Sequence, residues 1–299
     1  MTPKTKTFWE RTFSTVILLS ILGGAVAWDE PLGYGILIAL FCNLTTIEWY
    51  RMLKGRAADR PLVLVGGLVY PWLLLLITQG VICSPQLQGA GLLSAVMLGG
   101  GGLALYSILA FARQILAMDY KGKSGQLALA GAAETILAFV YPVWLLCFAF
   151  WFCFKGCHEE CHFLLWIVLV TKMSDIWAYV TGVPFGGKFI TARFSPAVSP
   201  KKSWEGIIGS FIITTALGVL LGHGILASAD TLFLTLFSAV IFVVAVFGDL
   251  AGSLIKRGLG VKDSGSLLPG IGGIFDLIDS PSFTVSLSLF ILPVLCLIC

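Results

Sequence analysis

The chain has 299 residues, of which 58% are hydrophobic and only 12% are charged, and its mean hydropathy is +0.95. A soluble domain carries roughly 25% charged residues, so this composition excludes a soluble globular protein, a disordered chain and a nucleic-acid-binding protein. The apolar runs are long and continuous rather than alternating, which also excludes a β-barrel. The class that remains is an all-α polytopic membrane protein, in which the net charge of +3 matters only through its placement.

Nine apolar stretches approach the length of about 20 residues that a helix needs to cross a bilayer. They cover residues 12–28, 32–49, 62–82, 91–112, 127–154, 163–183, 206–227, 232–252 and 282–299. The fifth stretch is long and contains Pro142. We interpret it as one kinked or tilted span, because two spans would put later basic loops on the opposite side from earlier ones. The first stretch also resembles a signal peptide, with Ala25-Val26-Ala27 as a cleavage site.

Basic residues lie almost entirely in alternate connecting segments. With the N-terminus in the cytoplasm, 17 of the 19 Lys and Arg residues fall in cytoplasmic segments, and only Lys155 falls on the opposite side. Cytoplasmic loops are enriched in Lys and Arg, so the sequence predicts a cytoplasmic N-terminus and an external C-terminus. The charged motifs are confined to residues 127–299, which we expect to carry the catalytic loops. Residues 1–126 then supply N-terminal helices to the same membrane unit.

Ionisable residues inside a span are costly and indicate function by default. Lys172 and Asp175 lie three residues apart within the span 163–183, so they share a helix face and are expected to pair. The alternative role for this pair is a structural ion pair that faces the interior of the helix bundle. Glu48 stands near the end of a span beside Arg51, and we interpret it as an interfacial residue.

Three carboxylates lie near the ends of the last two spans. Asp249 ends the span 232–252, and Asp276 and Asp279 are one turn apart where the last helix should begin. A Gly-rich turn and several basic residues lie between Asp249 and the other two acids. Carboxylates beside glycines and basic residues suit Mg²⁺ bound to a polyphosphate. We therefore predict that these three carboxylates converge on Mg²⁺, with room for a second metal ion. Helix capping by acids is the structural alternative, and it explains only one of the three.

A basic pair, Lys201 and Lys202, precedes the span 206–227. Basic residues at this position often act only as a topology determinant or contact anionic lipid. Binding of a substrate phosphate is the functional alternative. On charge alone both roles remain open.

The two charged blocks together resemble the phosphatidate cytidylyltransferase (CDP-diacylglycerol synthase) family. The first block runs from Ser174-Asp175 through Phe185-Gly186 to Ser199-Pro200-Lys201-Lys202-Ser203-Trp204-Glu205-Gly206. The second comprises Gly248-Asp249, Ser253-x-x-Lys256-Arg257, Lys262-Asp263-Ser264, Pro269-Gly270-x-Gly272-Gly273, Asp276 and Asp279. The resemblance covers about residues 171–282, and the earlier spans match only in being apolar. Ile271 and Leu277 stand where the family usually has His and Arg.

The resemblance implies transfer of CMP from CTP to phosphatidate, with Mg²⁺, at the cytoplasmic face of a bacterial inner membrane. It implies catalytic roles for Asp249, Asp276, Lys201 and Lys202, and metal binding by Asp249, Asp276 and Asp279. Substrate contacts are expected from Asp175, Ser199, Ser253, Lys256, Arg257, Lys262, Asp263, Gly272 and Gly273. The partners are then CTP, phosphatidate and membrane lipids, with no nucleic acid. The sequence permits a homodimer without specifying one.

Two other functions remain open from the sequence. A CTP-dependent lipid kinase would transfer the γ-phosphoryl group to an alcohol and release CDP. A transporter would use Lys172 and Asp175 as a relay in the membrane. A transporter should show duplicated halves, whereas the charged motifs here occupy only the second half of the chain.

A Cys-His cluster, Cys157-His158-Glu159-Glu160-Cys161-His162, falls in a loop on the predicted outer side. Cys and His four residues apart are compatible with zinc, and the two Cys are compatible with a disulfide. The spacing is not that of a common zinc module. We expect a loop without metal, on the side opposite to CTP.

Overall fold

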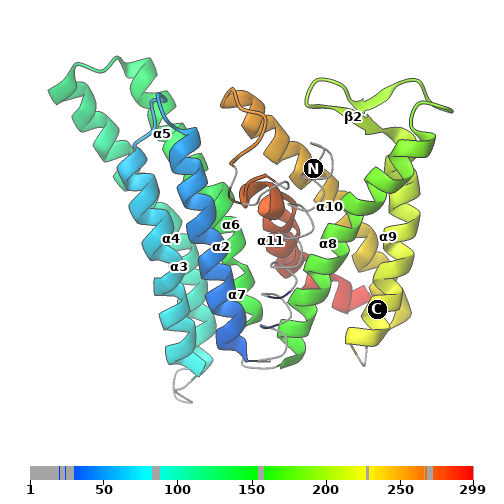
Figure 1. The fold of residues 1–299 in the computed structure, drawn as a ribbon. Coiled ribbons are helices and arrows are strands. Elements are labelled where there is room, and N and C mark those ends of the chain that lie inside the picture. The colour runs from blue at the N-terminus through cyan, green and yellow to red at the C-terminus, as the bar shows by residue number, and fades with distance from the viewer. Residues whose placement is uncertain are drawn as a thin grey trace. The chain divides into compact units, whose positions relative to one another are not determined.

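The computed structural model is almost entirely helical (Figure 1) and describes residues 20, 24, 30–82, 88–153, 158–226, 229–265, 267 and 272–298. Its helices are α2 (Pro31–Met52), α3 (Arg60–Ile82), α4 (Gln88–Lys121), α5 (Gly125–Phe139), the π-helical turn η2 (Val140–Trp144), α6 (Leu145–Cys147), α7 (Ala149–Phe152), α8 (His158–Phe185), α9 (Trp204–Ile225), α10 (Thr231–Gly258) and α11 (Phe275–Ile298). Within these residues the only sheet is an antiparallel hairpin of β1 (Arg193–Ser195) and β2 (Ser199–Ser203). The predicted all-α class is confirmed.

Among the described residues, seven helices are long and apolar enough to cross a membrane. They are Pro31–Met52, Arg60–Thr78, Gly100–Tyr120, Gly125–Phe152, Cys161–Phe185, Trp204–Ile225 and Thr231–Gly258. Each overlaps one of the predicted spans, so the chain is a multi-pass membrane protein. The predicted span 12–28 lies almost wholly outside the described residues, and the predicted span 282–299 lies largely within α11. The full number of spans and their orientation stay predictions.

The long fifth stretch forms one helical run from Gly125 to Phe152, as predicted. Its regular hydrogen bonding is interrupted at the π-helical turn that contains Pro142. Proline has no backbone N–H and its ring crowds the carbonyl one turn earlier, and a π turn is a common way for a helix to absorb such a defect. The run therefore needs no loop at Pro142.

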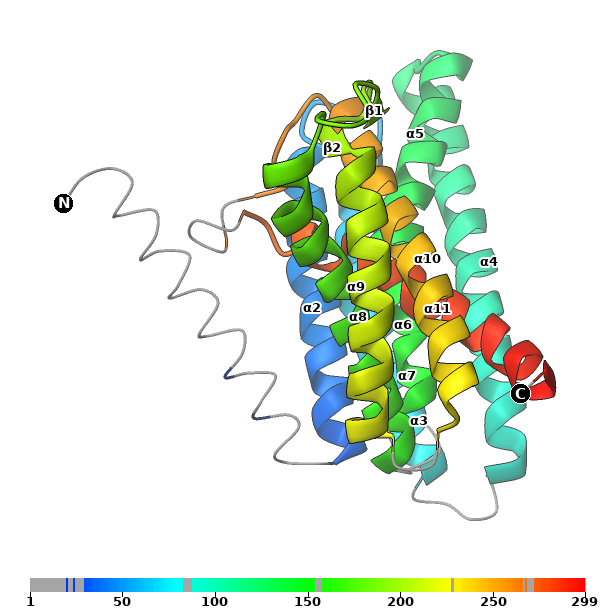
Figure 2. The ribbon, with the colours of Figure 1, turned by 90° about the vertical axis from the view of Figure 1, so that its right-hand side faces the viewer.

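The chain forms two compact units. The first unit comprises residues 1–158 and 263–278, and within it α2 packs on α3, α3 on α4, and α4 on α5. The second unit comprises residues 159–262 and 279–299, and within it α9 packs on α10, as Figure 2 shows. The loop that precedes α11 thus belongs to the first unit, whereas most of α11 belongs to the second.

Small residues let the helices of the second unit approach closely. A Cβ atom added at Gly206 of α9 would lie 2.9 Å from the carbonyl oxygen of Ala178 on α8. The Ser210 hydroxyl donates to the carbonyl oxygen of Ser174 (2.8 Å), and the Trp166 indole N–H donates to that of Gly218 (2.8 Å). Close contact through small residues and such bonds is how helices associate in membranes. These contacts hold the Ser174-Asp175 turn of α8 against α9.

Helix α10 continues six residues beyond its predicted end at residue 252. The extension contains the apolar Leu254 and Ile255 and no proline. Lys256 and Arg257 lie in its last turn, where cations interact favourably with the helix dipole. Asp249 therefore lies inside a helix, with Ser253 and Lys256 one and two turns further along.

Candidate active site

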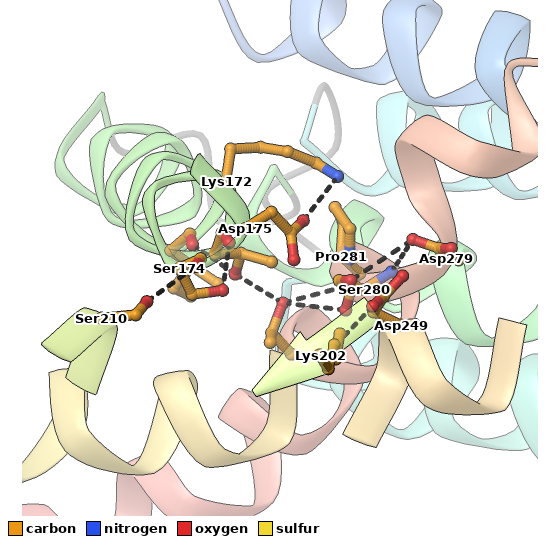
Figure 3. Close-up of polar contacts among 12 residues, drawn as sticks. Lys172, Ser174, Asp175, Lys202, Ser210, Asp249, Asp279, Ser280 and Pro281 are labelled. Atoms are coloured by element: carbon orange, nitrogen blue, oxygen red, sulfur yellow. Dashed lines mark hydrogen bonds and ion pairs between the residues drawn. The ribbon is translucent and has the colours of Figure 1, made fainter. Parts of the chain in front are cut away.

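Three lysine–aspartate pairs form a charged cluster in the second unit (Figure 3). They are Lys172–Asp175 (3.5 Å), Lys202–Asp249, and Lys256–Asp279 (3.7 Å), each joining Nζ to Oδ2. The predicted pairing of Lys172 with Asp175 is confirmed. The cluster, which keeps this name below, draws on α8, β2, α10 and α11, so both charged blocks meet in it. Its three cations and three carboxylates balance, which lowers the cost of placing ionised groups in a membrane protein.

The β2 strand gives the two lysines of the basic pair different surroundings. Successive side chains of a strand point to opposite faces of the sheet. The Lys202 side chain is 16% exposed and pairs with Asp249, whereas Lys201 is exposed. The preceding Ser199 is half-buried at the start of the same strand, opposite Ser195. The sequence predicted one role for both lysines, and the structure distinguishes them.

Asp279 is the most enclosed acid of the cluster, with its side chain only 3% exposed. Beyond Lys256, its carboxylate lies within electrostatic reach of Lys172 and Asp249. Gly252 of α10 makes room for it, because a Cβ atom at that position would lie 2.7 Å from Asp279 Oδ2. Gly248, one turn earlier, similarly faces the Cα atom of Ser280 at 2.9 Å. The Gly-x-x-x-Gly spacing therefore lets α10 approach α11 around a buried carboxylate.

Asp276 lies in the first unit, in the first turn of α11, which directly follows the segment 263–274 that we call the signature loop. Its Oδ2 atom accepts from the Ser264 hydroxyl (2.9 Å) and from the backbone N–H groups of Ser264 (3.3 Å) and Gly273 (3.1 Å). Gly272 has a φ of +122°, a conformation that side chains rarely allow. The carboxylate thus fixes the turn that leads into α11, which is the capping role considered as the alternative for one of the three acids.

Glu48 is not an interfacial residue, and that prediction is wrong. Its side chain is fully buried on α2, and its carboxylate accepts from the backbone N–H groups of Ile274 (2.8 Å) and Phe275 (2.9 Å). The signal in the sequence was an acid within an apolar span. We interpreted it as interfacial because Arg51, a surface residue, follows three positions later. The true partners lie more than 200 residues away in sequence.

Glu205 is a second residue whose role only the structure identifies. It sits in the first turn of α9, and its Oε1 atom accepts from the backbone N–H groups of Gly187 (3.1 Å), Phe189 (3.0 Å) and Ile190 (2.9 Å). The turn after α8 is thereby fastened to the start of α9. Ser203, which caps α9 through the Gly206 N–H, completes this connection between the hairpin and the helix.

We expect Glu205→Ala to loosen the 187–190 turn and lower kcat/KM by about tenfold, because charge-assisted hydrogen bonds to a carboxylate are the stronger kind. Hydrogen exchange of residues 187–190 should accelerate in the same variant. Glu205→Gln retains an acceptor oxygen and should lose less by both measures. Unchanged exchange in the Ala variant would contradict this role.

The remaining predicted substrate contacts lie on α10, in the turn that follows it and in the signature loop. Ser253 is half-buried on α10, Arg257 is exposed in its last turn, and Lys256 is buried. Lys262 and Asp263 are both exposed in the loop that follows. Ile271 lies outside the described residues, and Leu277 is half-buried on α11.

The described residues include no group of three or more His, Cys, Asp or Glu side chains placed to hold a metal ion. The convergence of Asp249, Asp276 and Asp279 on Mg²⁺ therefore stays a prediction. In the Cys-His cluster, Cys161 is buried on α8 and Cys157 lies outside the described residues.

Comparison with known proteins identifies the family. A family model described as the cytidylyltransferase family matches residues 9–295, which is almost the whole chain. The chain belongs to the cytidylyltransferase family. The match extends through the N-terminal helices, where the sequence alone showed only apolar character.

Several relatives of this cytidylyltransferase carry the name phosphatidate cytidylyltransferase. The Haemophilus influenzae protein is 27% identical over 91% of this chain and 93% of its own length. The Pseudomonas aeruginosa protein is 31% identical over 91% of this chain and 92% of its own length. A Helicobacter pylori protein is 39% identical over 54% of this chain, and that match spans 56% of the Helicobacter protein.

Proposed function

We propose that this cytidylyltransferase transfers CMP from CTP to phosphatidate and releases pyrophosphate. The observation that carries the proposal is the charged cluster, in which Lys202 of the first block pairs with Asp249 of the second. It is supported by relatives with this name that match over more than nine-tenths of the chain. The product would be CDP-diacylglycerol, a precursor of phospholipids.

The reaction needs positioned charges more than a proton acceptor. A phosphate oxygen of phosphatidate attacks the α-phosphorus of CTP, an O–P bond forms, and the bond to the β-phosphate breaks. The nucleophile is already ionised near neutral pH, so no general base is required. Lys202 and the exposed Lys201 would bind phosphate oxygens and offset the charge that develops on them. Holding both substrates in line supplies much of the remaining rate enhancement.

The three carboxylates predicted to bind Mg²⁺ suit the ion in their donor chemistry. Magnesium in such sites takes one or two carboxylates and completes its shell with water and substrate phosphate. Asp249, whose side chain is 28% exposed beside Lys202, retains access for such a ligand, and Asp276 and Asp279 are the other predicted ligands. When bound, the ion would neutralise charge on the CTP phosphates.

A radiochemical assay tests the proposal. Purified protein receives Mg²⁺, CTP labelled in the cytidine, and either phosphatidate or a long-chain lipid alcohol as acceptor. Labelled CDP-diacylglycerol is the expected product. Labelled CDP with a phosphorylated alcohol would instead indicate the lipid kinase, and absence of turnover with either acceptor would overturn the proposal.

The proposed site is expected to face the cytoplasm of a bacterial inner membrane. The basis is the distribution of Lys and Arg, because 17 of 19 fall in segments predicted to be cytoplasmic. CTP and Mg²⁺ are available on that side. A homodimer stays a prediction that the mass of the purified protein in detergent would test.

The orientation predicts the reactivity of single cysteines introduced into a cysteine-free, folded variant. Cysteine at Arg56 or Lys262 should be protected from an impermeant thiol reagent in intact cells and should react after permeabilisation. Cysteine at Glu159 should react in intact cells. Labelling of residue 262 from outside would contradict the predicted topology, and it would also contradict a cytoplasmic active site.

A further inference from the structure

Glu48 joins the N-terminal helices to the start of α11. The two oxygens of its carboxylate have separate donors: Oε1 accepts from the Ile274 N–H and Oε2 from the Phe275 N–H. The first N–H groups of a helix have no partner within that helix, and the positive end of the helix dipole favours an anion there. Both oxygens of Glu48 therefore satisfy the first turn of α11 from inside the first unit.

The Ser264 hydroxyl links Glu48 to Asp276. Its oxygen lies 3.3 Å from Glu48 Oε2 and 2.9 Å from Asp276 Oδ2. A hydroxyl has one proton to donate, so the two carboxylates compete for it, and each is held mainly by backbone N–H groups. Asp276 is bound by the Gly273 N–H, and Glu48 binds the next two N–H groups along the chain. The position of Asp276 thus depends on a turn that Glu48 holds.

Two glycines in the signature loop give Glu48 the space that this arrangement requires. A Cβ atom at Gly273 would lie 2.5 Å from Glu48 Oε2, and one at Gly265 would lie 2.7 Å from Glu48 Oε1. Separations below 3.0 Å force a displacement of the neighbouring atoms. The Gly272-Gly273 pair of the motif therefore serves two purposes: Gly272 allows the turn, and Gly273 leaves room for the buried Glu48 carboxylate.

Aromatic side chains also pack where α2 meets the start of α11, a contact that we call the junction. The Phe275 ring is fully buried and meets Trp49 and Tyr141 edge-on, with ring centroids 5.3 Å apart in each case. Trp49 follows Glu48 directly in α2. The same turn of α2 therefore binds the backbone of α11 by charge and its first side chain by packing, which leaves little freedom at the helix start.

We propose that Glu48 is a positioning residue for the cytidylyl transfer, and that it holds Asp276 in its reactive place by fixing the N-terminus of α11. The proposal deepens the proposed function and rests on it. A carboxylate is required because both of its oxygens accept. In either orientation, Glu48→Gln would place an amide NH₂ against the backbone N–H of Ile274 or that of Phe275, and two donors cannot satisfy each other.

The test compares Glu48→Gln and Glu48→Asp with wild type by two independent measurements. Amide exchange at residues 274 and 275 should be about ten- to a hundredfold faster in Glu48→Gln, because hydrogen bonds to a charged group are lost. Its kcat should fall by about a hundredfold, as expected for a misplaced reactive group, with KM for phosphatidate little changed. Glu48→Asp keeps both oxygens on a shorter stem and should lie between wild type and Gln.

Glu134→Gln is the matched control, because it makes the same chemical change in the first unit. Glu134 pairs with Arg56 and accepts from the Ala58 N–H, away from α11, and its variant should keep normal kcat and normal exchange at 274–275. Normal kcat per folded molecule in Glu48→Gln, or unchanged exchange at these amides, overturns the proposal. If Glu48→Gln does not fold, Glu48→Asp decides by the same criteria. The exchange measurement needs no turnover, so it still reports on the junction if wild type proves to make no CDP-diacylglycerol.

Discussion

Asp249→Asn is expected to lower CMP transfer by about a thousandfold, the scale seen when a charged or polar group that stabilises a transition state is removed. Asp249 pairs with Lys202, and it is a predicted Mg²⁺ ligand. Asn keeps the shape and one acceptor oxygen but removes the negative charge. The Mg²⁺ concentration required for the residual turnover should rise. The measurement is the rate of CDP-diacylglycerol formation across a Mg²⁺ titration.

Asp276→Asn should show a loss of similar size, and Asp279→Asn a smaller one in activity. The Asp279 carboxylate is enclosed beside Lys256, so its replacement leaves a buried cation less well compensated and should mainly reduce thermal stability. If the Asp279→Asn variant instead keeps its thermal stability but loses its Mg²⁺ dependence, Asp279 is a direct ligand of the metal.

Asp230→Asn is the matched control for these variants. Asp230 caps the opposite end of the same helix, α10, through the Leu232 N–H, and Asn is an equally good cap. It should retain normal rates and a normal Mg²⁺ titration. Near-normal rates in Asp249→Asn and Asp276→Asn, with an unchanged titration, would show that the metal assignment is wrong.

Lys202→Ala is expected to lower kcat/KM by about a hundredfold with the protein still inserted and folded. The lysine is half-buried and its ammonium lies against Asp249, so its loss removes a phosphate-binding cation and leaves Asp249 without this partner. Lys201→Ala should also lower kcat/KM, by a smaller factor, because that side chain is exposed. Arg at position 202 should restore activity only partly, since a guanidinium is larger and planar.

Lys188→Ala removes another exposed lysine from the segment between α8 and α9 and should leave kcat/KM unchanged. Steady-state rates with CTP and phosphatidate varied separately show which substrate each lysine binds. Full activity in a Lys201→Ala, Lys202→Ala double variant would show that the pair serves only to orient the protein in the membrane.

The sequence by itself determined the class of the protein and the elements that run along the chain. Apolar length alone predicts a membrane helix, because backbone groups in lipid must be satisfied within the segment. The run through Pro142 was predicted as one span because two spans would have put later basic loops on the opposite side from earlier ones. The Lys172–Asp175 pair was predictable because residues three apart on a helix are neighbours whatever the surroundings. The motif spacing likewise identified the residues from which the charged cluster is built.

Only the tertiary structure decided which partners the polar groups acquire. Nothing near Glu48 in sequence indicates that its partners are Ile274 and Phe275, and its neighbour Arg51 suggested a different role. Lys201 and Lys202 are adjacent residues of the same type, so the sequence does not distinguish them. They differ in the structure because the strand directs Lys202 toward Asp249. Local patterns report the periodicity of an element. Burial and pairing depend on contacts between segments far apart in the chain, for which a single sequence has no periodic signal.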